Sequence, residues 1–534
     1  MNRYLRDALL LLMISSCRST NVQDSSGLLQ AKDLIDYKNY SGSIVCHPGS
    51  VIQANSIEDV QKAVRDASAQ HKTIRALSLT APRSYSPVIC PEDGDIILNV
   101  QALNKIISVD KAARTAIVQP GILISELQDQ LSPKGFTFPV TPDYNGVSIA
   151  GGMATGAHHS SLQFATEIAD WVEEVKLVDG AGELRTLSGE QLDTARVHLG
   201  LLGVIVELTV RIIPQHKVKY GFEKFADDRL EQDLESLVRA HEYARILWFP
   251  SKKKFILDHF DTVPMSTPGE STNNLWTSTP DISALGDIPV GALNVGQVVQ
   301  CSAESLRLNT YKGPFKVVDS EKNAPVGLSH KMIAGNCPPG KCSWDFGVKT
   351  RTVEVGIALD RAQDWIRDVR KMFAARRACF PVLGIYLRFS AASKSALGEA
   401  SGRDTVVFEI HIPQTSSPSI EPSSDVYDEM VQMTLAKYDG RPHWGKNSLP
   451  YFLNLGPKQY PQWDKFEQLR SELDPNGVFT SPFWKAIRSQ ASVPHGAGCA
   501  VSKQCICQQN SDCGSDAICI PGAFFKEARV CKRD

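Results

Sequence analysis

Two periods of apolar residues alternate along the N-terminal part of the chain, which predicts helices and strands within the same domain. After Ser56, the apolar positions Val60, Ala63, Val64 and Ala67 recur at helical spacing, with Asp59 at the capping-box position. Residues 124–131 predict a second helix. Short β-rich runs predict strands at 43–53, 95–100, 105–109, 116–119, 172–178, 184–187 and 204–213. This mixture predicts an α+β domain over Lys38 to Pro214.

A second region starts near Lys217. Its best helical stripe is Ala362, Trp365, Ile366, Val369, Met372 and Phe373, which we interpret as core rather than a cofactor site. The Ser-, Thr- and Pro-rich residues 266–281 predict a long surface loop. Residues 414–425 predict a boundary between two regions of the chain. A further helix carries Trp463, Phe466, Leu469 and Leu473 and ends at the turn 474–477.

Composition excludes several classes of protein. The chain has 534 residues, 42% apolar and 22% charged, as in ordinary globular proteins of two to four domains. The 57 Lys and Arg residues nearly balance the 59 Asp and Glu residues, so no global field favours nucleic acid as a partner. Because no apolar run reaches 18 residues, a bundle of spanning helices is also excluded.

The N-terminus and the cysteines point to export. Arg3 and Arg6 precede the apolar stretch 8–14, and Ile14-Ser-Ser-Cys17 resembles a bacterial lipobox, so residues 1–17 predict an export signal. We expect a secreted protein or a periplasmic or outer-membrane lipoprotein. Lipidation of Cys17, with membrane attachment, remains open against simple secretion.

The chain has 13 cysteines, and without Cys17 an even number remains, which permits complete disulfide pairing. Six of them crowd into Cys499–Cys531, a polar tail that needs such staples. Zinc at Cys337 and Cys342, or at Cys505 and Cys507, would need reduced thiolates, and the spacing fits no common zinc finger. We therefore expect no metal.

Three elements carry candidate chemistry, although neither a P-loop nor a Rossmann fingerprint is present. Residues 148–161 join glycines, hydroxyls and the adjacent histidines His158 and His159, so backbone N–H groups can approach a planar or phosphorylated ligand there. We predict a loop here, and the alternative is that this loop is only a structural turn. Gly200-Leu-Leu-Gly203 leads into an apolar strand, and Arg441-Pro-His443-Trp444-Gly-Lys446 gathers functional groups on a loop.

Together these elements resemble the aldonolactone oxidases of the vanillyl-alcohol oxidase superfamily, which have a PCMH-type FAD-binding domain. The resemblance covers most of the chain. It includes Val118-Gln-Pro-Gly121, the 151–161 segment, Ala195-Arg-Val-His198-Leu-Gly200-Leu-Leu-Gly203 and His443-Trp-Gly-Lys446. Cys342-Ser-Trp-Asp345, Trp365-Ile-Arg-Asp-Val369 and the tail ending Lys526-Glu-Ala-Arg-Val-Cys531 resemble the plant-type branch, that of L-gulono-1,4-lactone oxidases.

The resemblance implies a two-lobed FAD-binding domain at 38–214 and a mixed α/β substrate or cap domain at 215–425. It further implies a segment at 426–490 that returns to the flavin, and a small disulfide-rich tail at 495–534. It implies catalytic roles for Arg388 and Lys446, which would hold and polarise substrate oxygens. The residues implied to bind the cofactor are Arg83, Ser84, Gly151, Gly152, Thr155, Gly156, His158, Ser160, Gly203, Val204, Ile205 and Lys446.

Two departures from the family pattern matter. Where many members carry a histidine bonded covalently to flavin, this chain has Arg83, followed by Ser84 and Tyr85. We therefore expect non-covalent FAD, with Arg83 either pairing with the cofactor's charge or serving a structural role. Some distant relatives place a Glu two residues before the catalytic Arg, whereas this chain has Tyr386.

The implied reaction is oxidation of a sugar-1,4-lactone, with hydride passing from the hydroxyl-bearing carbon to flavin N5 and electrons passing on to O₂ or another acceptor. The hydroxyl must also lose a proton, and His443 is the candidate base, against a structural histidine held by Trp444. Two alternatives stay open: an exported alditol or oligosaccharide oxidase, and a non-catalytic surface binding protein on a decayed flavin scaffold.

Overall fold

The computed structural model describes residues 37–39, 41–79, 84–273, 297–313, 315–316, 325–334, 350–376, 378–379, 384–413, 423–453, 459–492, 498–500 and 505–533. The predictions for residues 1–17, Arg83, Cys337 and Cys342 lie outside the described residues, as do residues 274–281 of the loop predicted at 266–281 and residues 414–422 of the boundary predicted at 414–425. No helix among the described residues has the length and apolar character needed to span a bilayer.

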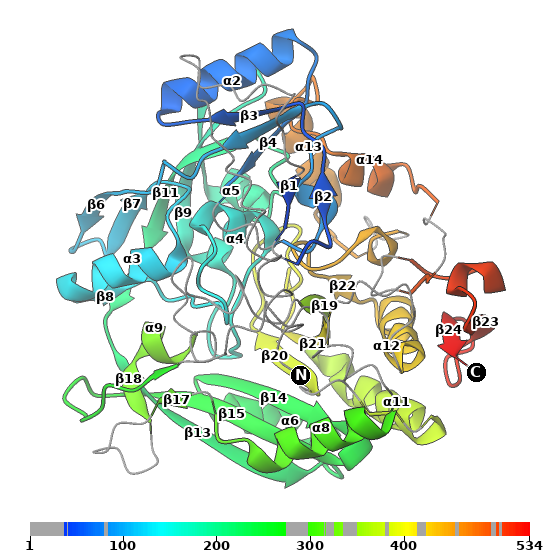
Figure 1. Cartoon of the computed structure of the whole chain (residues 1–534). Helices are drawn as coiled ribbons and strands as arrows, with labels where there is room; N and C mark the ends of the chain where they lie inside the picture. Colours follow the sequence, from blue (N-terminus) through cyan, green and yellow to red (C-terminus); the bar gives the residue numbers. More distant parts are fainter. Residues whose placement is uncertain are drawn as a thin grey trace, which may run out of the picture.

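The first lobe is a parallel sheet of three strands, in the order β3 (Ser50–Gln53), β5 (Ile96–Asn99) and β4 (Ile74–Leu77). Helix α2 (Ile57–Ala69) connects β3 to β4, as a parallel pair requires. The predicted capping box at Ser56 and Asp59 is confirmed, and the predicted apolar stripe of this helix is buried. Figure 1 shows this lobe in blue at the top of the molecule.

The second lobe is an antiparallel sheet of five strands in the order β10 (Leu184–Ser188), β9 (Val172–Val178), β11 (Val204–Arg211), β7 (Thr115–Val118) and β6 (Ile106–Asp110). Helix α3 (Ile124–Leu131) has the predicted bounds. Smaller elements complete the lobe: β8 (Phe136–Thr137), η4 (Ile168–Trp171), α5 (Gly189–Ala195) and β12 (Ile213–Pro214). The two sheets together confirm a two-lobed α+β domain.

Two local predictions were wrong. The strand predicted over 43–53 is broken into β2 (Val45–Cys46), which pairs with β1 (Tyr37–Lys38), and β3. Pro48 has no N–H to donate, and a Cβ at Gly49 would lie 2.1 Å from the Gly94 carbonyl oxygen, so the chain bends there.

The glycine-rich segment is also not a loop throughout. It begins as helix α4 (Ile149–Thr155) and ends at Gly156, which adopts a left-handed φ of 75°. A Cβ at Gly152 would lie 2.6 Å from the Ile168 methyl carbon, so the glycine allows close packing against η4. Tertiary packing here overrides the low helix propensity of two glycines.

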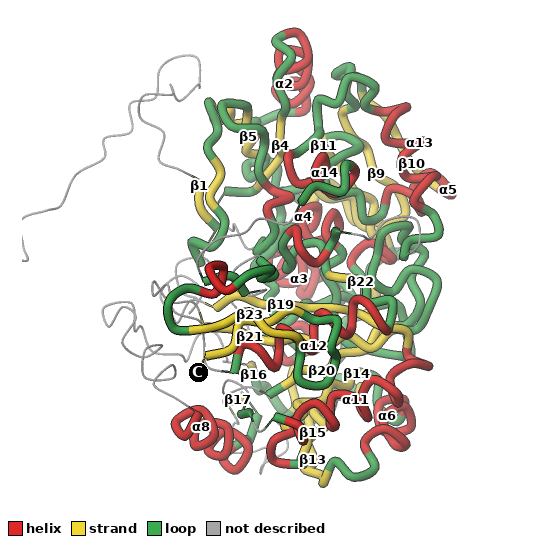
Figure 2. The backbone as a smooth tube through the Cα atoms, turned by 90° about the vertical axis from the view of Figure 1, so that its right-hand side faces the viewer, coloured by secondary structure: helices red, strands yellow, loops and turns green. Residues whose placement is uncertain are grey.

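The third sheet has eight antiparallel strands. Their order is β18 (Val326–Leu328), β13 (Lys217–Ala226), β15 (Lys254–Val263), β14 (Tyr243–Phe249), β20 (Ile385–Ser390), β21 (Thr405–Pro413), β19 (Thr350–Ala358) and β22 (Arg441–Pro442). Figure 2 shows α6 (Leu230–Arg239) and α11 (Ala362–Ala375) beside one another along this sheet.

Helix α11 buries the predicted apolar stripe against one face of this sheet. Trp365 packs against Trp248 and stacks on Phe408, with ring centroids 6.1 and 5.3 Å apart. Because neighbouring side chains on a strand point to opposite faces, Leu247 and Glu409 point away from α11. They therefore face the two N-terminal lobes.

The chain returns to the first lobe after β22. Helix α13 (Trp463–Leu473), which confirms the predicted helix, is followed by a turn with Gly477 at a φ of 69°, and then by α14 (Pro482–Arg488). The Ile74 N–H donates to the Val478 carbonyl at 2.8 Å, and Arg75 donates to the Phe479 carbonyl.

The remaining described elements are short or lie at the periphery of these sheets. The helices are α8 (Gln297–Thr310), α9 (Ser329–Met332) and α12 (Ser424–Lys437), and the strands are β16 (Thr272–Asn273) and β17 (Phe315–Lys316). The 3₁₀ turns are η2 (Pro87–Ile89), η3 (Ser132–Lys134), η5 (Pro250–Lys252), η8 (Leu359–Arg361), η9 (Leu449–Tyr451) and η11 (Asn510–Cys513).

The cysteines confirm the disulfide prediction wherever they are described. Cys46 pairs with Cys90, and Cys301 with Cys379. Three further disulfides, Cys499–Cys505, Cys507–Cys519 and Cys513–Cys531, staple a tail that carries the hairpin β23 (Ala517–Pro521) and β24 (Arg529–Arg533). Cys505 and Cys507 are thus not available as zinc thiolates.

The tail packs against helix α12 through one buried carboxylate. Glu429 accepts backbone N–H bonds from Ala523 at 2.8 Å, Phe524 at 2.6 Å and Phe525 at 2.5 Å. Gln432 of the same helix bonds both backbone groups of Arg529. The tail is therefore a stapled cap on helix α12, and Figure 1 shows it in red beside that helix.

Candidate active site

A cavity of about 560 Å³ lies between the two N-terminal lobes and the eight-stranded sheet. Its size falls within the usual range for small-molecule and cofactor sites. One end is lined by small residues and backbone of the lobes, among them Ala76, Ser78, Gly151, Gly152, Thr155 and Gly203. The other end is lined by charged and polar side chains of the sheet and of the 443–446 turn, among them Arg245, Tyr386, Arg388, Glu409 and Lys446.

The small-residue end contains most of the residues predicted to bind the cofactor. Ser84, Gly151, Gly152, Thr155, His158, Gly203, Ile205 and Lys446 all line the cavity. Three predicted residues are not among its lining. Gly156 ends helix α4, Val204 is buried in the core of the first lobe, and Ser160 accepts the Phe389 N–H at 2.9 Å. Ser161 continues this attachment by bridging to Ser390, so the segment after α4 is held against β20.

His198 lines the same end, and the sequence analysis did not name it as a site residue. Its Nδ1 accepts the Gly200 N–H at 3.1 Å, so the neutral ring carries its hydrogen on Nε2. Burial, reinforced by the charge of Arg75, lowers the pKa of His198 to about 3. Its buried Nε2 has no hydrogen-bond partner in the described part of the chain. A buried donor of this kind calls for an acceptor on a bound ligand.

Strand register brings the charged end together. Glu354 on β19 lies opposite Glu409 on β21, which lies opposite Tyr386 on β20. Arg388 is two residues further along β20 and therefore shares the face of Tyr386. Residues far apart in the sequence thus form one row on the sheet face that borders the cavity.

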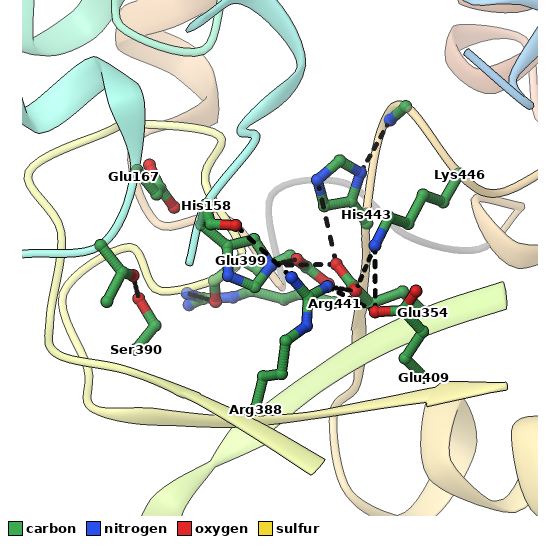
Figure 3. Close-up of polar contacts among 12 residues, drawn as sticks. His158, Glu167, Glu354, Arg388, Ser390, Glu399, Glu409, Arg441, His443 and Lys446 are labelled. Carbon is green, nitrogen blue, oxygen red and sulfur yellow. Dashed lines mark hydrogen bonds and ion pairs between the residues drawn. The ribbon is translucent and has the colours of Figure 1, made fainter. Parts of the chain in front are cut away.

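The turn after β22 delivers Lys446 to this row. Trp444 anchors the turn because its buried indole stacks on Phe452 and donates to the Leu397 carbonyl at 2.7 Å. The Gly445 carbonyl accepts the Tyr85 N–H at 2.8 Å, which ties the turn to the N-terminal lobes. Lys446 Nζ then lies 2.6 Å from Glu354 Oε2 and 3.1 Å from Glu409 Oε2 (Figure 3).

Glu354 is the centre of this charge cluster, and its carboxylate is fully buried. It pairs with Arg388 and Lys446, and its Oε1 lies 3.0 Å from His158 Nε2 and 3.9 Å from His443 Nε2 (Figure 3). Burial alone would raise the pKa of Glu354, but Arg388 and Lys446 hold it well below its usual range. Glu354 is therefore an ionised carboxylate that fixes both cations.

Glu399 lies beside this cluster, but its pKa is shifted in the opposite direction to that of Glu354. Burial, and then the charge of Glu354, raises its pKa well above the ordinary value. Its Oε2 is 3.7 Å from His158 Nε2. The structure thus brings the three predicted catalytic residues, Arg388, His443 and Lys446, together with carboxyl groups that the sequence analysis missed.

Glu354 and Glu409 did carry a sequence signal. Each has apolar residues on both sides in its strand, within Thr-Val-Glu354-Val and Val-Phe-Glu409-Ile. A charge at such a position is costly unless a partner is buried with it. The pattern indicates paired charges, but only the fold identifies the partners.

The cavity also contains a second group of polar side chains. Arg245 pairs with Asp143 at 2.8 Å and with Asp258 at 2.9 Å, and the Tyr386 hydroxyl donates to Asp143 at 2.9 Å. Arg307, Tyr311 and Thr352 line this region as well. So many donors and acceptors suit a ligand that carries several hydroxyl or carbonyl oxygens.

Sequence profiles of three families match the chain. That of D-arabinono-1,4-lactone oxidase matches residues 208–487, more than half of the chain. A profile for an FAD binding domain matches residues 48–188, and one for the C-terminal domain of L-gulonolactone oxidase 2-like proteins matches residues 496–533.

Curated relatives extend over most of the chain. L-gulonolactone oxidase 3 of Arabidopsis thaliana is 27% identical, over 93% of this chain and 91% of its own length. An L-gulono-1,4-lactone dehydrogenase of Mycobacterium tuberculosis is 25% identical, over 84% of this chain and 98% of its own length.

Solved structures show the same fold at lower identity. A solvent-stable cholesterol oxidase superposes with a TM-score of 0.66 at 15% identity, covering 88% of this chain and 99% of that one. A cholesterol oxidase from B. sterolicum gives 0.66 at 16% identity, covering 86% and 97%. These likenesses establish the PCMH-type FAD-binding fold.

The residues of the cavity fit FAD. The Nε2–H of His198 provides a donor. Among the described residues, the only close neighbour that a Cβ at Gly151 would meet is the Ser148 hydroxyl, which leaves its cavity side open to a ligand. Backbone of the N-terminal lobes and the cations of the sheet lie at opposite ends of one space. The chain therefore belongs to the D-arabinono-1,4-lactone oxidase family and is an FAD-dependent oxidoreductase.

Proposed function

We propose that this enzyme oxidises a sugar-1,4-lactone of the L-gulono-1,4-lactone type at a hydroxyl-bearing carbon. The observation that carries the proposal is the charged end of the cavity, where Arg388, Lys446 and Glu409 converge beside Arg245 and Asp143. A small lactone presents hydroxyl, ring and carbonyl oxygens to such a set of groups. The names of the relatives from Arabidopsis and Mycobacterium support the same substrate class.

The same groups argue against a sterol, although the solved structures of similar fold are named cholesterol oxidases. A sterol offers one hydroxyl on a large hydrocarbon frame. Binding it here would leave Arg245, Asp258 and Asp143 against apolar surface, and such desolvated charges are costly. A polar, compact substrate avoids that cost.

In this reaction, bound FAD supplies the acceptor for two electrons. Arg388 and Lys446 hold the substrate oxygen and stabilise negative charge that develops on it as the C–H bond breaks. Both cations are fixed beforehand by Glu354, so little reorganisation is needed during the step.

Three finer features belong to the proposal. FAD is held non-covalently, because Arg83 stands where many relatives have the linking histidine. Electrons leave to O₂ or another oxidant, in line with relatives named both oxidase and dehydrogenase. The protein is exported, as secreted protein or as lipoprotein through Cys17, and its five described disulfides support an oxidising compartment.

Steady-state assays of the purified holoenzyme test this function. L-gulono-1,4-lactone, L-galactono-1,4-lactone, an alditol and cholesterol are compared with O₂ and with an artificial electron acceptor. We expect the highest kcat/KM with a lactone. An alditol preferred over both lactones would replace the substrate, and flavin-bound protein inactive with all four would favour a binding protein on a decayed scaffold. Flavin that remains with the pellet after acid precipitation would refute non-covalent binding.

A further inference from the structure

Oxidation of the substrate hydroxyl requires a base, and the hydrogen bonds of the site identify which group has room for the proton. We propose that Glu409 accepts the hydroxyl proton, and that His443, the base expected from the sequence, does not. The inference rests on the proposed function, since it assigns a residue to that reaction. It follows from the hydrogen-bonding state of each candidate that lines the cavity near Arg388 and Lys446.

His443 has no free lone pair. The Gly445 N–H donates to its Nδ1 at 3.0 Å, so in the neutral ring Nε2 carries the hydrogen. A proton could add only at Nδ1, and that would break the bond to Gly445. Burial also lowers the pKa of His443 well below its usual value, despite the nearby charge of Glu354. His443 is thus held neutral as a donor.

The ring of His158 is bonded differently, because its Nδ1 donates where that of His443 accepts. Its Nδ1 lies 2.7 Å from the His159 carbonyl oxygen, and because a carbonyl only accepts, Nδ1 donates. Its Nε2 lies 3.0 Å from the ionised Glu354, which also only accepts, so that contact requires a second ring hydrogen. Both ring nitrogens of His158 are therefore engaged, and neither has a lone pair open to the substrate proton.

The remaining candidates are also occupied. His411 Nε2 lies 3.3 Å from Glu409 Oε1, and its Nδ1 lies 3.3 Å from the Thr352 hydroxyl, so the neutral ring donates to one and accepts from the other. The Tyr386 hydroxyl is an acid that donates to Asp143. Asp143 itself pairs with Arg245 and accepts the Tyr386 hydroxyl.

Glu409 retains capacity to accept. Its Oε2 lies 2.6 Å from Arg388 and 3.1 Å from Lys446, and its Oε1 faces His411. A carboxylate offers about four lone-pair positions, so three donors leave one for a substrate hydroxyl. Glu409 lines the cavity, whereas Glu354, its neighbour in the same row, is not among the lining residues and contacts His158.

The step balances in atoms and electrons. The substrate O–H bond breaks and its proton moves to the Glu409 carboxylate. The C–H bond breaks with its electron pair, which passes as hydride to the flavin, and a C=O bond forms. The substrate is oxidised by two electrons, and Arg388 and Lys446 compensate the charge on its oxygen while the proton moves.

Charged and titratable groups surround Glu409 on every side. Arg388 and Tyr386 face it from β20, Glu354 from β19, Lys446 from the 443–446 turn, and His411 from its own strand. Arg388 and Lys446 carry two positive charges, His411 is neutral, and Glu354 carries one negative charge. The net charge of these neighbours of Glu409 is therefore positive. A general base works only in its deprotonated form, so we expect the rate of flavin reduction to fall in acid.

The experiment follows anaerobic flavin reduction against pH in wild-type holoenzyme, Glu409→Gln and His443→Gln, each first checked for bound flavin. We expect Glu409→Gln to reduce flavin roughly 100-fold more slowly at neutral pH and to lose the acid limb of the profile. His443→Gln should keep that limb whatever its rate. A wild-type rate in Glu409→Gln, or loss of the limb in His443→Gln alone, overturns the assignment.

Two further measurements keep the test decisive if Glu409→Gln binds flavin poorly. Formate should restore reduction in Glu409→Ala but not in His443→Ala, and rescue of His443→Ala alone contradicts the proposal. In the ¹⁵N spectrum of wild-type holoenzyme, His443 should stay neutral with its hydrogen on Nε2 between pH 5 and 9, and a titrating His443 contradicts it. If an alditol reduces the wild-type flavin and lactones do not, the substrate proposal fails while Glu409 is tested with the alditol.

Discussion

The two ends of the cavity are built in different ways. At the N-terminal lobes, backbone and small residues such as Gly151 and Gly203 line the space, and the Nε2–H of His198 has no partner in the described part of the chain. At the eight-stranded sheet, buried charges on Arg388, Glu409 and Lys446 compensate one another. The first end suits holding a large cofactor by close approach, and the second suits fixing charge where a reaction needs it. Substitutions at the charged end should therefore cost far more than those at the small-residue end.

Glu354→Gln should show the largest effect. Without this carboxylate, Arg388 and Lys446 keep their positive charges in a buried site with one partner fewer. We expect a loss of about 3–5 kcal/mol in the free energy of unfolding, measured by urea denaturation. Asp66→Asn, which removes an exposed pair with Lys62, is the matched control and should leave the transition midpoint in place. A loss as small as that of the control would mean that the cluster does not depend on Glu354.

Lys446→Met should come next and affect catalysis rather than cofactor content. The ammonium stabilises charge on the substrate oxygen, so kcat should fall roughly 100-fold. Flavin per protein, read from the visible spectrum, should stay near the wild-type ratio. Lys62→Met on helix α2, whose side chain is 75% exposed, controls for loss of a lysine elsewhere. Unchanged turnover in Lys446→Met would remove this residue from the mechanism.

The dependence of folding stability on pH should be a smaller effect. Burial lowers the pKa of both His159 and His198 to about 3, whereas an unfolded histidine titrates near 6.5. Between these values the unfolded chain binds more protons, so stability is greatest above about pH 6.5 and falls as the pH decreases. Each histidine should contribute a slope of about 1.4 kcal/mol per pH unit below its unfolded pKa. Denaturation between pH 5 and 6.5 should show a shallower slope in His198→Gln, and an identical slope would contradict the burial of a neutral His198.

His198→Ala should have the smallest effect, on cofactor affinity. Loss of one hydrogen bond costs about 1 kcal/mol, so the Kd for FAD should rise roughly five-fold. Fluorescence titration of the flavin-free protein measures this directly, with His216→Gln as a control outside the cavity lining. An unchanged Kd would show that the cofactor does not take up the free N–H of His198.

Local pattern predicted much of the fold. Helices α2, α3, α11 and α13 lie where apolar residues recur at helical spacing, because an amphipathic helix records its buried face in its own sequence. The break at Pro48-Gly49 and the helix α4 were missed, since both depend on distant partners, Gly94 and Ile168.

The residues of the site likewise fall into those that the sequence predicts and those that it does not. The small-residue end was predictable because its segments are continuous motifs. Glu354 and Glu409 become partners of Arg388 only through the register of β19, β21 and β20, which no local pattern encodes. The hydrogen positions that distinguish His443 from His158 depend on single backbone contacts with Gly445 and His159. Fold class and cofactor could therefore be predicted from the sequence, and the arrangement of charge could not.

Anaerobic rapid mixing of the holoenzyme with L-gulono-1,4-lactone tests the central claim most directly, because it isolates electron transfer from substrate to the bound cofactor. We predict that the oxidised flavin absorbance bleaches in a single turnover, and more slowly with lactone deuterated at the reacting carbon, since breakage of that C–H bond is the proposed step. Flavin that stays oxidised with lactones but bleaches with cholesterol would contradict the account of the charged end of the cavity.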